Sequence, residues 1–387
     1  MARLGMENLA RKDDLILVLN SGSSSLKFGV YHRGSGGDGD EKPLLTGSAE
    51  GIGQNNGTFK IRFSDGNAPV ERKGVLESQN VALSTLAATV REQLHIAPVA
   101  VGHRVVHGGP ELRTHQLITP QVLDQLRAAT HFAPLHIPQA LKLIGSAQKI
   151  FPSALHFACF DDAFHRTIPE VASHLPLPQR YFDAGIRRYG FHGLSYESLV
   201  HHFGESLPER AIFAHLGNGA SLCALRNGVS IDTTMGLTPT GGIPMGTRSG
   251  DLDPGVFLYL LRNEKLGDDE LEDLFNHQSG LFALSGGESD VKALEERIRS
   301  NDPQAALALN VFAVSVRKVI GAFAALLGGV DLLVFTGGIG EHSDHVRSLA
   351  ASGLEFLGLT PDKIKIVSTE EELQIARHCR RMIVKTG

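Results

Sequence analysis

Short apolar runs of strand length alternate along the chain with turns that are rich in glycine and serine. Residues 15–19 (Leu-Ile-Leu-Val-Leu) form the first run, and the turn 20–25 separates it from a second predicted strand, 26–31. Residues 78–95 have apolar positions at helical spacing, which predicts an amphipathic helix. This alternation predicts a mixed α/β fold. The other predicted helices are 120–130, 138–150, 303–327 and 370–385, and the other predicted strands are 98–106, 155–160, 211–215, 222–226 and 331–335.

The second half of the chain repeats the strand–turn–strand pattern of the first. The turn 216–221, Leu-Gly-Asn-Gly-Ala-Ser, separates two predicted strands in the same way as the turn 20–25. Aligning Ser25 with Ser221 gives an offset of 221 − 25 = 196 residues, close to half of the 387-residue chain. Two halves that each open with a hairpin loop of phosphate size indicate a duplicated α/β architecture.

A third glycine-rich turn, Thr336–His342, follows a buried strand and is predicted to lead into a helix that runs to about Leu357. None of the three turns has the spacing of a P-loop, so together they favour phosphate binding of another kind, although each alone could be a plain hairpin. The glycines in the flexible loop 33–43 match a dinucleotide fingerprint by spacing. They precede Asp-Glu-Lys-Pro rather than a helix, so that interpretation is rejected.

Composition and charge exclude several classes of protein. Lys and Arg number 37 against 42 for Asp and Glu, so the net charge of −5 lacks the basic footprint of a nucleic-acid binder. The three cysteines are far apart, which argues against a disulfide framework or a thiolate zinc site and favours a reducing, cytoplasmic location. Charges bound the first apolar run closely, so neither a signal peptide nor a transmembrane helix is expected, and no membrane partner.

Two arginines and one aspartate stand where chemistry is expected. Arg248 lies in the Gly/Pro-rich stretch 236–255, a long loop of the kind that usually carries function. Arg104 lies at the end of a predicted strand, where a solvated surface arginine is an equal alternative. Asp161 ends the predicted strand 155–160, so it either faces a binding cleft or caps the next helix.

Histidines are numerous, 18 in all, but their spacing does not indicate a metal site. His131 and His136 are separated by a proline, and His201 and His202 are adjacent. His192 lies between glycines near basic residues, although by pattern alone a structural core histidine is the stronger interpretation.

These segments together resemble the acetate kinase family, which belongs to the acetate and sugar kinase/Hsp70/actin superfamily. The resemblance runs in family order over nearly the whole chain and is most specific in the N-terminal hairpin and in residues 245–254. The resembling segments are 17–27, 102–109, 160–165, 188–193, 215–221, 232–254, 335–341 and 371–377.

The resemblance implies a duplicated, two-lobed, actin-like (ribonuclease H-like) ATPase fold with its active site in the interdomain cleft. Residues 1–164 with 373–387 would form the lobe for the acyl substrate and Mg²⁺, and residues 165–372 the lobe for the nucleotide. The implied activity is reversible, in-line phosphoryl transfer from ATP to acetate, giving acetyl phosphate and ADP. Mg²⁺ would be the cofactor, with Mn²⁺ able to substitute, and the protein would be a homodimer.

Site residues are carried over position by position as implications of this resemblance. The catalytic residues would be Asp161, His192, Arg248 and His136, and Asn20 and Glu371 would hold Mg²⁺. Arg104 would bind the acyl carboxylate or phosphate, and the methyl group would lie among Val106, Leu135, Phe191 and Pro239. ATP would be bound by Ser23, Ser25, Lys27, His215, Leu216, Gly217, Asn218, Gly219, Asp290, Val291, Lys292, Gly338, Ile339, Gly340, Glu341 and His342.

The chain departs from the family pattern at a few positions. Leu194-Ser195-Tyr196 stands where the family usually has Thr-Ser-His, Ile137 replaces an asparagine, and Lys292 replaces a frequent arginine. None of these removes a proposed catalytic group. A propionate or butyrate kinase is the alternative within the same class, and an actin- or Hsp70-like ATP-driven interaction module is the alternative from another class. The arginines Arg104 and Arg248 favour a kinase, because an ATPase switch needs no carboxylate-binding arginine.

Overall fold

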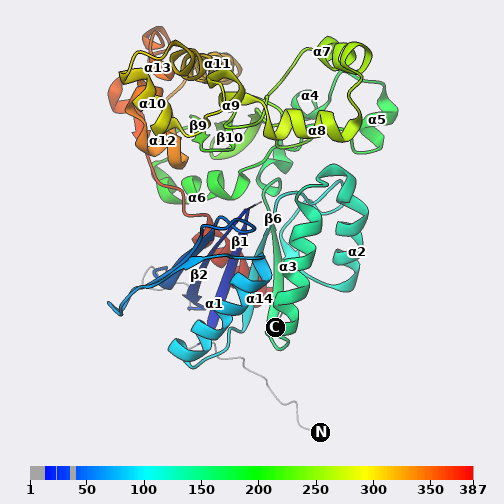
Figure 1. Ribbon diagram of the computed structural model, residues 1–387, viewed down its shortest axis with the longest axis vertical. Helices are drawn as coiled ribbons and strands as arrows, with labels where there is room; N and C mark the ends of the chain where they lie inside the picture. The colour runs from blue at the N-terminus through cyan, green and yellow to red at the C-terminus, as the bar shows by residue number, and fades with distance from the viewer. Residues whose placement is uncertain (1–13, 23, 35–40, 387) are drawn as a thin grey trace. The chain divides into compact units, whose positions relative to one another are not determined.

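The computed structural model describes residues 14–22, 24–34 and 41–386, which divide into two compact units. Unit 1 contains the chain up to Ala163 together with the segment that begins at Glu370, and unit 2 is Phe164–Thr369. The chain therefore leaves unit 1 once and returns to it with its last helix (Figure 1). The predicted lead-in and Ser23 lie outside the described residues, as does most of the predicted loop 33–43.

Unit 1 is built on a sheet with the strand order β5-β4-β3-β2-β1-β6-β8-β7. The inner strand β1 (Leu15–Ser21) runs antiparallel to β2 (Ser25–His32) and parallel to β6 (Ala100–Val105). Because β1 is buried on both faces, its sequence is a continuous apolar run without alternation. The other strands are β3 (Pro43–Glu50), β4 (Gly57–Phe63), β5 (Val70–Gly74), β7 (Gln116–Leu117) and β8 (Leu155–Phe160).

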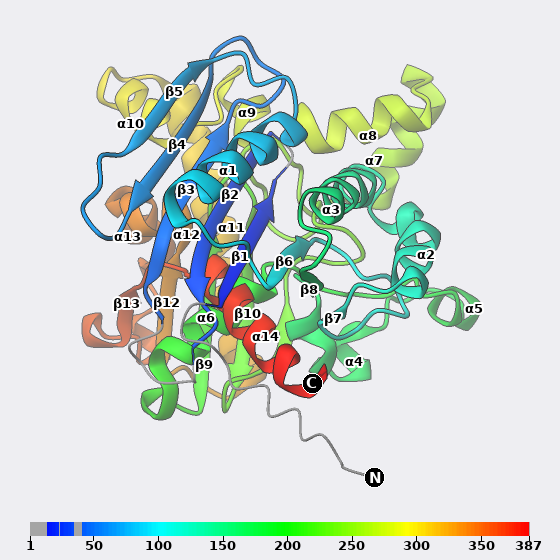
Figure 2. The same ribbon diagram turned by 90° about the horizontal axis from the view of Figure 1, so that it is seen from below.

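Helices cover both faces of this sheet. α14 (Glu371–Thr386) packs along β1, β2 and β6 on one face (Figure 2). Gly102 allows this approach, since a side chain there would come within 2.7 Å of Cys379 Sγ. α1 (Gln79–Leu94) and α3 (Ile137–Ile150) pack against each other and against β2 and β6 on the other face (Figure 1). The remaining helical segments of unit 1 are α2 (Pro120–Ala128) and the 3₁₀ turn Ala129–Phe132.

Unit 2 contains a second sheet, in the order β11-β10-β9-β12-β13. β9 (Arg210–Leu216) pairs antiparallel with β10 (Ala220–Arg226) and parallel with β12 (Leu332–Thr336). The strands β3-β2-β1-β6-β8 of unit 1 have the same order and the same directions. The duplication predicted from the two hairpins is therefore present in the topology. The remaining strands are β11 (Val229–Thr233) and β13 (Ile364–Ile366).

The longest helix of unit 2, α11 (Pro303–Leu327), has the bounds that the sequence predicts. The side chain of Asp302 caps its first turn, and Gly328 ends it in the left-handed conformation, with φ of 74°. By length and composition α11 could cross a membrane, but it packs against α9, α10, α13, β9 and β10 within unit 2. The other helices are α4 (Glu170–Ser173), α5 (Gln179–Asp183), α6 (Gly193–Phe203), α7 (Pro254–Tyr259), α8 (Asp268–His277), α9 (Gly280–Ser285), α10 (Val291–Arg299), α12 (Gly337–His342) and α13 (Asp344–Ala351). Short 3₁₀ or π turns lie at Ala163–Thr167, Gly204–Ser206, Leu260–Glu264, Glu355–Leu357 and Pro361–Lys363.

The segment after β12 differs from the prediction of a glycine turn followed by one helix to Leu357. The turn is itself helical, as α12, and a separate helix, α13, follows it. Ser343 separates the two because its backbone is extended and its Oγ accepts a hydrogen bond from the N–H of Val346 at 3.1 Å. A serine in this position is an N-cap, which starts a new helix rather than continuing the previous one.

Candidate functional site

Arg104 and Asp161 form a buried ion pair at the ends of two neighbouring parallel strands of unit 1, β6 and β8. Arg104 Nε donates to both carboxylate oxygens at 3.0 and 2.9 Å, and Nη2 donates to Oδ2 at 2.5 Å. The side chains are 17% and 2% exposed. Of the alternatives that the sequence left open, Arg104 is a paired, only partly exposed arginine rather than a solvated one, and Asp161 directs its carboxylate to Arg104.

The charges of this pair depend on each other. Burial acts to lower the pKa of Arg104, but the negative charges of Asp161, Glu371 and Glu372 outweigh burial and raise it, so the guanidinium stays charged. Burial raises the pKa of Asp161 to about 6, although Arg104 acts in the opposite direction. Asp161 is therefore a carboxylate that titrates well above its usual range.

We expect the free energy of unfolding to depend on pH through the titration of Asp161. Its folded pKa of about 6 exceeds the unfolded value of about 3.9, so the folded state binds the proton more tightly. The contribution of Asp161 to the free energy of unfolding should thus be largest below about pH 4 and fall by roughly 3 kcal/mol as the pH rises to 6. Urea unfolding of the wild type and of Asp161→Asn at pH 4 to 7 measures this difference. A wild type that instead gains stability relative to Asp161→Asn as the pH rises would show that Arg104 lowers the pKa of Asp161.

Asn20, at the end of β1, joins the two glutamates that begin α14. Its Nδ2 donates to Glu371 Oε2 at 3.0 Å and to Glu372 Oε1 at 2.7 Å, and its Oδ1 accepts from Arg104 Nη1 at 3.3 Å. Asn20 and Glu371 are 351 positions apart in the sequence but are neighbours in the structure. They meet because α14 packs against β1, and Asn20 lies near the end of that strand.

These groups suit a magnesium ion. Carboxylate and amide oxygens are the hard ligands that Mg²⁺ prefers, and it usually keeps several waters in addition. Burial and the charge of Glu371 raise the pKa of Glu372, which indicates a surplus of negative charge that a divalent cation would relieve. Asn20, Glu371 and the adjacent Glu372 thus offer oxygen donors of the kind that Mg²⁺ prefers, and the metal-binding role of Asn20 and Glu371 stays a prediction.

The N-terminal hairpin presents two of its predicted phosphate-facing residues on one face. Ser25 begins β2, Leu26 is buried, and Lys27 is exposed, so strand alternation places the serine and the lysine on the same side. Lys27 is paired in register with Asn20 across the hairpin, and its charge lowers the pKa of Glu372.

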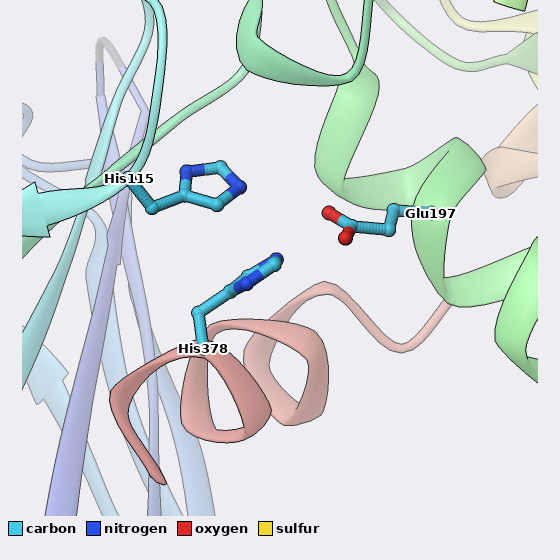
Figure 3. Close-up of side chains that lie close together, drawn as sticks. All are labelled: His115, Glu197 and His378. Carbon is cyan, nitrogen blue, oxygen red and sulfur yellow. The ribbon is translucent and has the colours of Figure 1, made fainter. Parts of the chain in front are cut away.

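Two histidines fasten the end of β8 to the surrounding chain in unit 1. The N–H of Phe160 donates to Nδ1 of His115 at 3.0 Å, so this nitrogen is an acceptor. The ring of His115 lies 3.9 Å from that of His378 on α14 (Figure 3). These contacts hold the residue before Asp161 in place. The third side chain in the figure, Glu197, belongs to α6 of unit 2.

In unit 2, His192 is held in an unusual backbone conformation at the start of α6. Its φ is 59°, in the left-handed region that a residue with a side chain rarely adopts and that is often found at functional sites. Its Nδ1 lies 2.8 Å from Ser221 Oγ, and its ring stacks on His215 with the centroids 4.2 Å apart. Nδ1 of His215 lies in turn 2.8 Å from Ser195 Oγ.

The β9–β10 hairpin brings His192 and Arg248 to one glycine. A side chain placed on Gly219 would lie 3.4 Å from both His192 Nε2 and Arg248 Nη1, so both cationic or donor groups border the space that this glycine leaves. Arg248 Nη1 also donates to the carbonyl of Pro239 at 3.2 Å. Another hydroxyl, Thr336 Oγ1, is buried at the end of β12, in register with His215, and has no hydrogen-bond partner within the described part of the chain.

The predicted ATP-binding residues from position 290 onward lie in α10 and α12 of unit 2 or at the N-cap of α10. Asp290 caps α10, since its Oδ1 accepts from the N–H of Ala293 at 2.9 Å. Glu341 accepts from the N–H of Gly337 at 3.1 Å and from Ser368 Oγ at 2.6 Å, so its carboxylate links the first residue of α12 to Ser368. Val291 is buried at the start of α10 and Lys292 is exposed, whereas in α12 Gly338 and His342 are exposed, Ile339 is partly exposed and Gly340 is buried.

The structure places the four predicted apolar pocket residues in both units. Val106 and Leu135 are partly exposed loop residues of unit 1, and Phe191 and Pro239 are buried in unit 2. His136 caps the start of α3 in unit 1 by its backbone, without a side-chain capping bond. The roles of these residues stay predictions.

Comparison with known proteins gives a consistent result. A sequence profile described as the Acetokinase family matches residues 15–386. An acetate kinase from Methylocella silvestris is 39% identical over 396 residues, covering 94% of this chain and 96% of its own. The crystal structure of an acetate kinase from Porphyromonas gingivalis has a TM-score of 0.83 at 33% identity and covers 96% of this chain and 100% of its own. A propionate kinase structure from Francisella tularensis has a TM-score of 0.86 at 34% identity, with coverages of 94% and 98%.

These similarities extend over both units and confirm the predicted fold class, the duplicated actin-like architecture. They also agree with what the side chains show, which is a buried arginine–carboxylate pair in unit 1 and a histidine and an arginine beside a glycine hairpin in unit 2. The chain belongs to the acetokinase family.

Proposed function

We propose that this protein is an acetate kinase, which transfers the terminal phosphoryl group of ATP to acetate and releases acetyl phosphate and ADP. The observation that carries this proposal is the agreement of the family match over residues 15–386 with the curated acetate kinases of about 39% identity. In unit 2, the convergence of His192 Nε2 and Arg248 Nη1 on Gly219 supports it independently.

The chemistry requires positioned charge more than covalent assistance. A phosphoryl group in transit carries its charge on its equatorial oxygens, and hydrogen-bond donors aimed at those oxygens stabilise it. Arg248 and His192 provide such donors beside the Gly217–Gly219 turn. The acceptor oxygen of acetate is already a carboxylate oxygen at neutral pH, so no general base is needed to activate it.

In unit 1, Asp161 orients Arg104, the arginine proposed to bind acetate, and does not remove a proton. It engages Nε and Nη2 of Arg104, which leaves Nη1, bonded to Asn20 at 3.3 Å, as the nitrogen on the side of the magnesium ligands. Asn20 and Glu371, with Glu372 beside them, would hold Mg²⁺. Bound there, the ion would neutralise charge on the phosphate oxygens of ATP.

A coupled assay that detects ADP tests the proposal. Purified protein is supplied with ATP, Mg²⁺ and, in turn, acetate, propionate, butyrate or no acceptor, and parallel reactions omit the metal. We expect ADP release that requires both the acceptor and the divalent cation, with acetate preferred. Release of ADP at the same rate without any acceptor would instead indicate an ATP-driven interaction module and would exclude the kinase.

A propionate kinase is the second candidate, and the structural similarity to the Francisella enzyme favours it specifically. The two activities differ by one methylene group, which a hydrophobic pocket distinguishes by only about 1–3 kcal/mol. The ratio of kcat/KM for acetate to that for propionate decides between them.

We also propose that the protein works as a homodimer, in the cytoplasm. Large apolar side chains that are more than a third exposed gather in one short segment around α7 in unit 2, and such patches mark interaction surfaces. They are Leu252, Val256, Phe257, Leu258, Tyr259 and Leu261. Light scattering on the purified protein should give twice the chain mass of 41.6 kDa, and a monomer would contradict the proposal.

A further inference from the structure

Three side chains in unit 2 form a hydrogen-bonded chain that ends on His192. The hydroxyl of Tyr196, on the first turn of α6, lies 2.5 Å from Ser221 Oγ, and this Oγ lies 2.8 Å from His192 Nδ1. Tyr196 and Ser221 are both fully buried.

The direction of these hydrogen bonds follows from what each group can donate. Burial raises the pKa of Tyr196 well above its usual value, so the phenol keeps its proton. In the part of the chain that the structure describes, Ser221 Oγ is the side-chain partner of this hydroxyl, and a buried phenol proton needs an acceptor. The hydroxyl oxygen of Ser221 is then the acceptor for the proton of Tyr196. Since a serine hydroxyl has one hydrogen, Ser221 directs it to the next group along, His192 Nδ1.

We propose that Tyr196 is a positioning residue for the transfer reaction, which acts through Ser221 to hold His192 in the neutral tautomer with its proton on Nε2. A ring nitrogen that accepts a hydrogen bond carries no proton, so the proton of the neutral ring must lie on the other nitrogen. The role of Tyr196 in the transfer rests on the proposed function. The tautomer of His192 is a property of the folded protein and does not depend on that function.

The position of the proton on His192 determines what the ring presents to the space beside Gly219. His192 Nε2 is the atom that borders the space beside this glycine, together with Nη1 of Arg248. A proton fixed on Nε2 makes His192 a hydrogen-bond donor to a phosphoryl oxygen in that space, while Arg248 supplies the positive charge. In the opposite tautomer, Nε2 would present a lone pair to the oxygen and repel it.

Nitrogen NMR tests the proposal directly. Long-range ¹H–¹⁵N spectra of the full-length protein labelled at histidine distinguish the two tautomers and the protonated ring, and the His192 signals are assigned by their loss in His192→Gln. We expect the wild type near pH 7.5 to have the proton on Nε2. A proton on Nδ1, or a ring protonated at both nitrogens, would overturn the proposal.

Variants then separate a positioning role from a structural one. Tyr196→Phe keeps the ring and removes the hydroxyl, so we expect a mixture of tautomers at His192 and a kcat lowered by about tenfold, with the KM values for ATP and acetate little changed. Ser221→Ala should shift the tautomer in the same way. If either variant keeps the proton wholly on Nε2, Tyr196 does not set it.

Tyr189→Phe is the matched control. Tyr189 is also fully buried in unit 2, and its hydroxyl donates to the carbonyl of Gly185 at 2.8 Å. This variant should lose a comparable hydrogen bond in stability but keep the wild-type tautomer and kcat. Equal changes in both phenylalanine variants would assign the effect to packing. If instead the tautomer is as expected but the wild type shows no acceptor-dependent transfer, the proposed function fails and the assignment of the proton stands.

Discussion

Replacing Arg248 by alanine should lower kcat by a factor on the order of 10³–10⁵, the range that arginines in such roles contribute to phosphoryl transfer. Its Nη1 borders Gly219 together with His192 Nε2, so we place it on charge that develops as the phosphoryl group moves. An interaction that is stronger in the transition state than in the ground state affects kcat more than KM. Lysine should restore little activity, because it lacks the planar fork that matches phosphate oxygens.

Steady-state kinetics on Arg248→Ala and Arg248→Lys, with circular dichroism to confirm folding, measure the effect. Arg226→Ala is the control, since Arg226 lies in the same unit and its Nη2 bonds to the carbonyl of Leu327 at 3.2 Å, a structural contact. We expect wild-type kcat from the control. A near-native kcat for Arg248→Ala would remove Arg248 from the reaction, whatever the family.

Replacing Arg104 by alanine should have two effects, because Arg104 is proposed to bind the substrate and also pairs with Asp161. The KM for acetate should rise while the KM for ATP changes much less, because Arg104 is proposed to bind the acyl carboxylate in ground and transition states alike. The protein should also lose about 3–5 kcal/mol of stability, since Asp161, with its side chain 2% exposed, would be left buried without its cation.

The double variant Arg104→Ala/Asp161→Asn separates the two effects, because it removes the unpaired charge along with the arginine. It should recover much of the lost stability but none of the affinity for acetate. Arg33→Ala is the control for loss of an ion pair, since Arg33 pairs with Asp14 at 3.0 Å in the same unit, with both side chains 19% exposed. Equal weakening of acetate and ATP binding in the Arg104 variants would refute the role given to Arg104.

The sequence by itself determined several of the elements and their duplication. The unbroken apolar run 15–19 identified a strand, and the structure explains the missing alternation, because β1 is buried on both faces. The sequence also predicted the bounds of α11, because the ending of a helix at a glycine such as Gly328 is local chemistry, set by neighbours in the chain. The hairpins at 20–25 and 216–221 revealed the repeat, since hairpin turns also depend on a few adjacent residues.

Local chemistry also explains the boundary that was predicted wrongly. Ser343 could have been recognised as an N-cap from its position before a helical segment, but glycines 337, 338 and 340 suggested a turn. Their low helix propensity was overridden by packing, because α12 contacts β9 and β12 in the folded unit.

Only the tertiary structure decided which polar groups meet. Arg104 and Asp161 are 57 residues apart and Asn20 and Glu371 are 351 apart, and no local pattern connects them. Parallel pairing of β6 with β8 joins the first pair, and packing of α14 on the sheet joins the second and adds Glu372. For the same reason, no local pattern predicted the roles of Ser221 and Tyr196. A serine in a hairpin and a tyrosine in a helix form a chain of hydrogen bonds to His192 only where the fold brings them together.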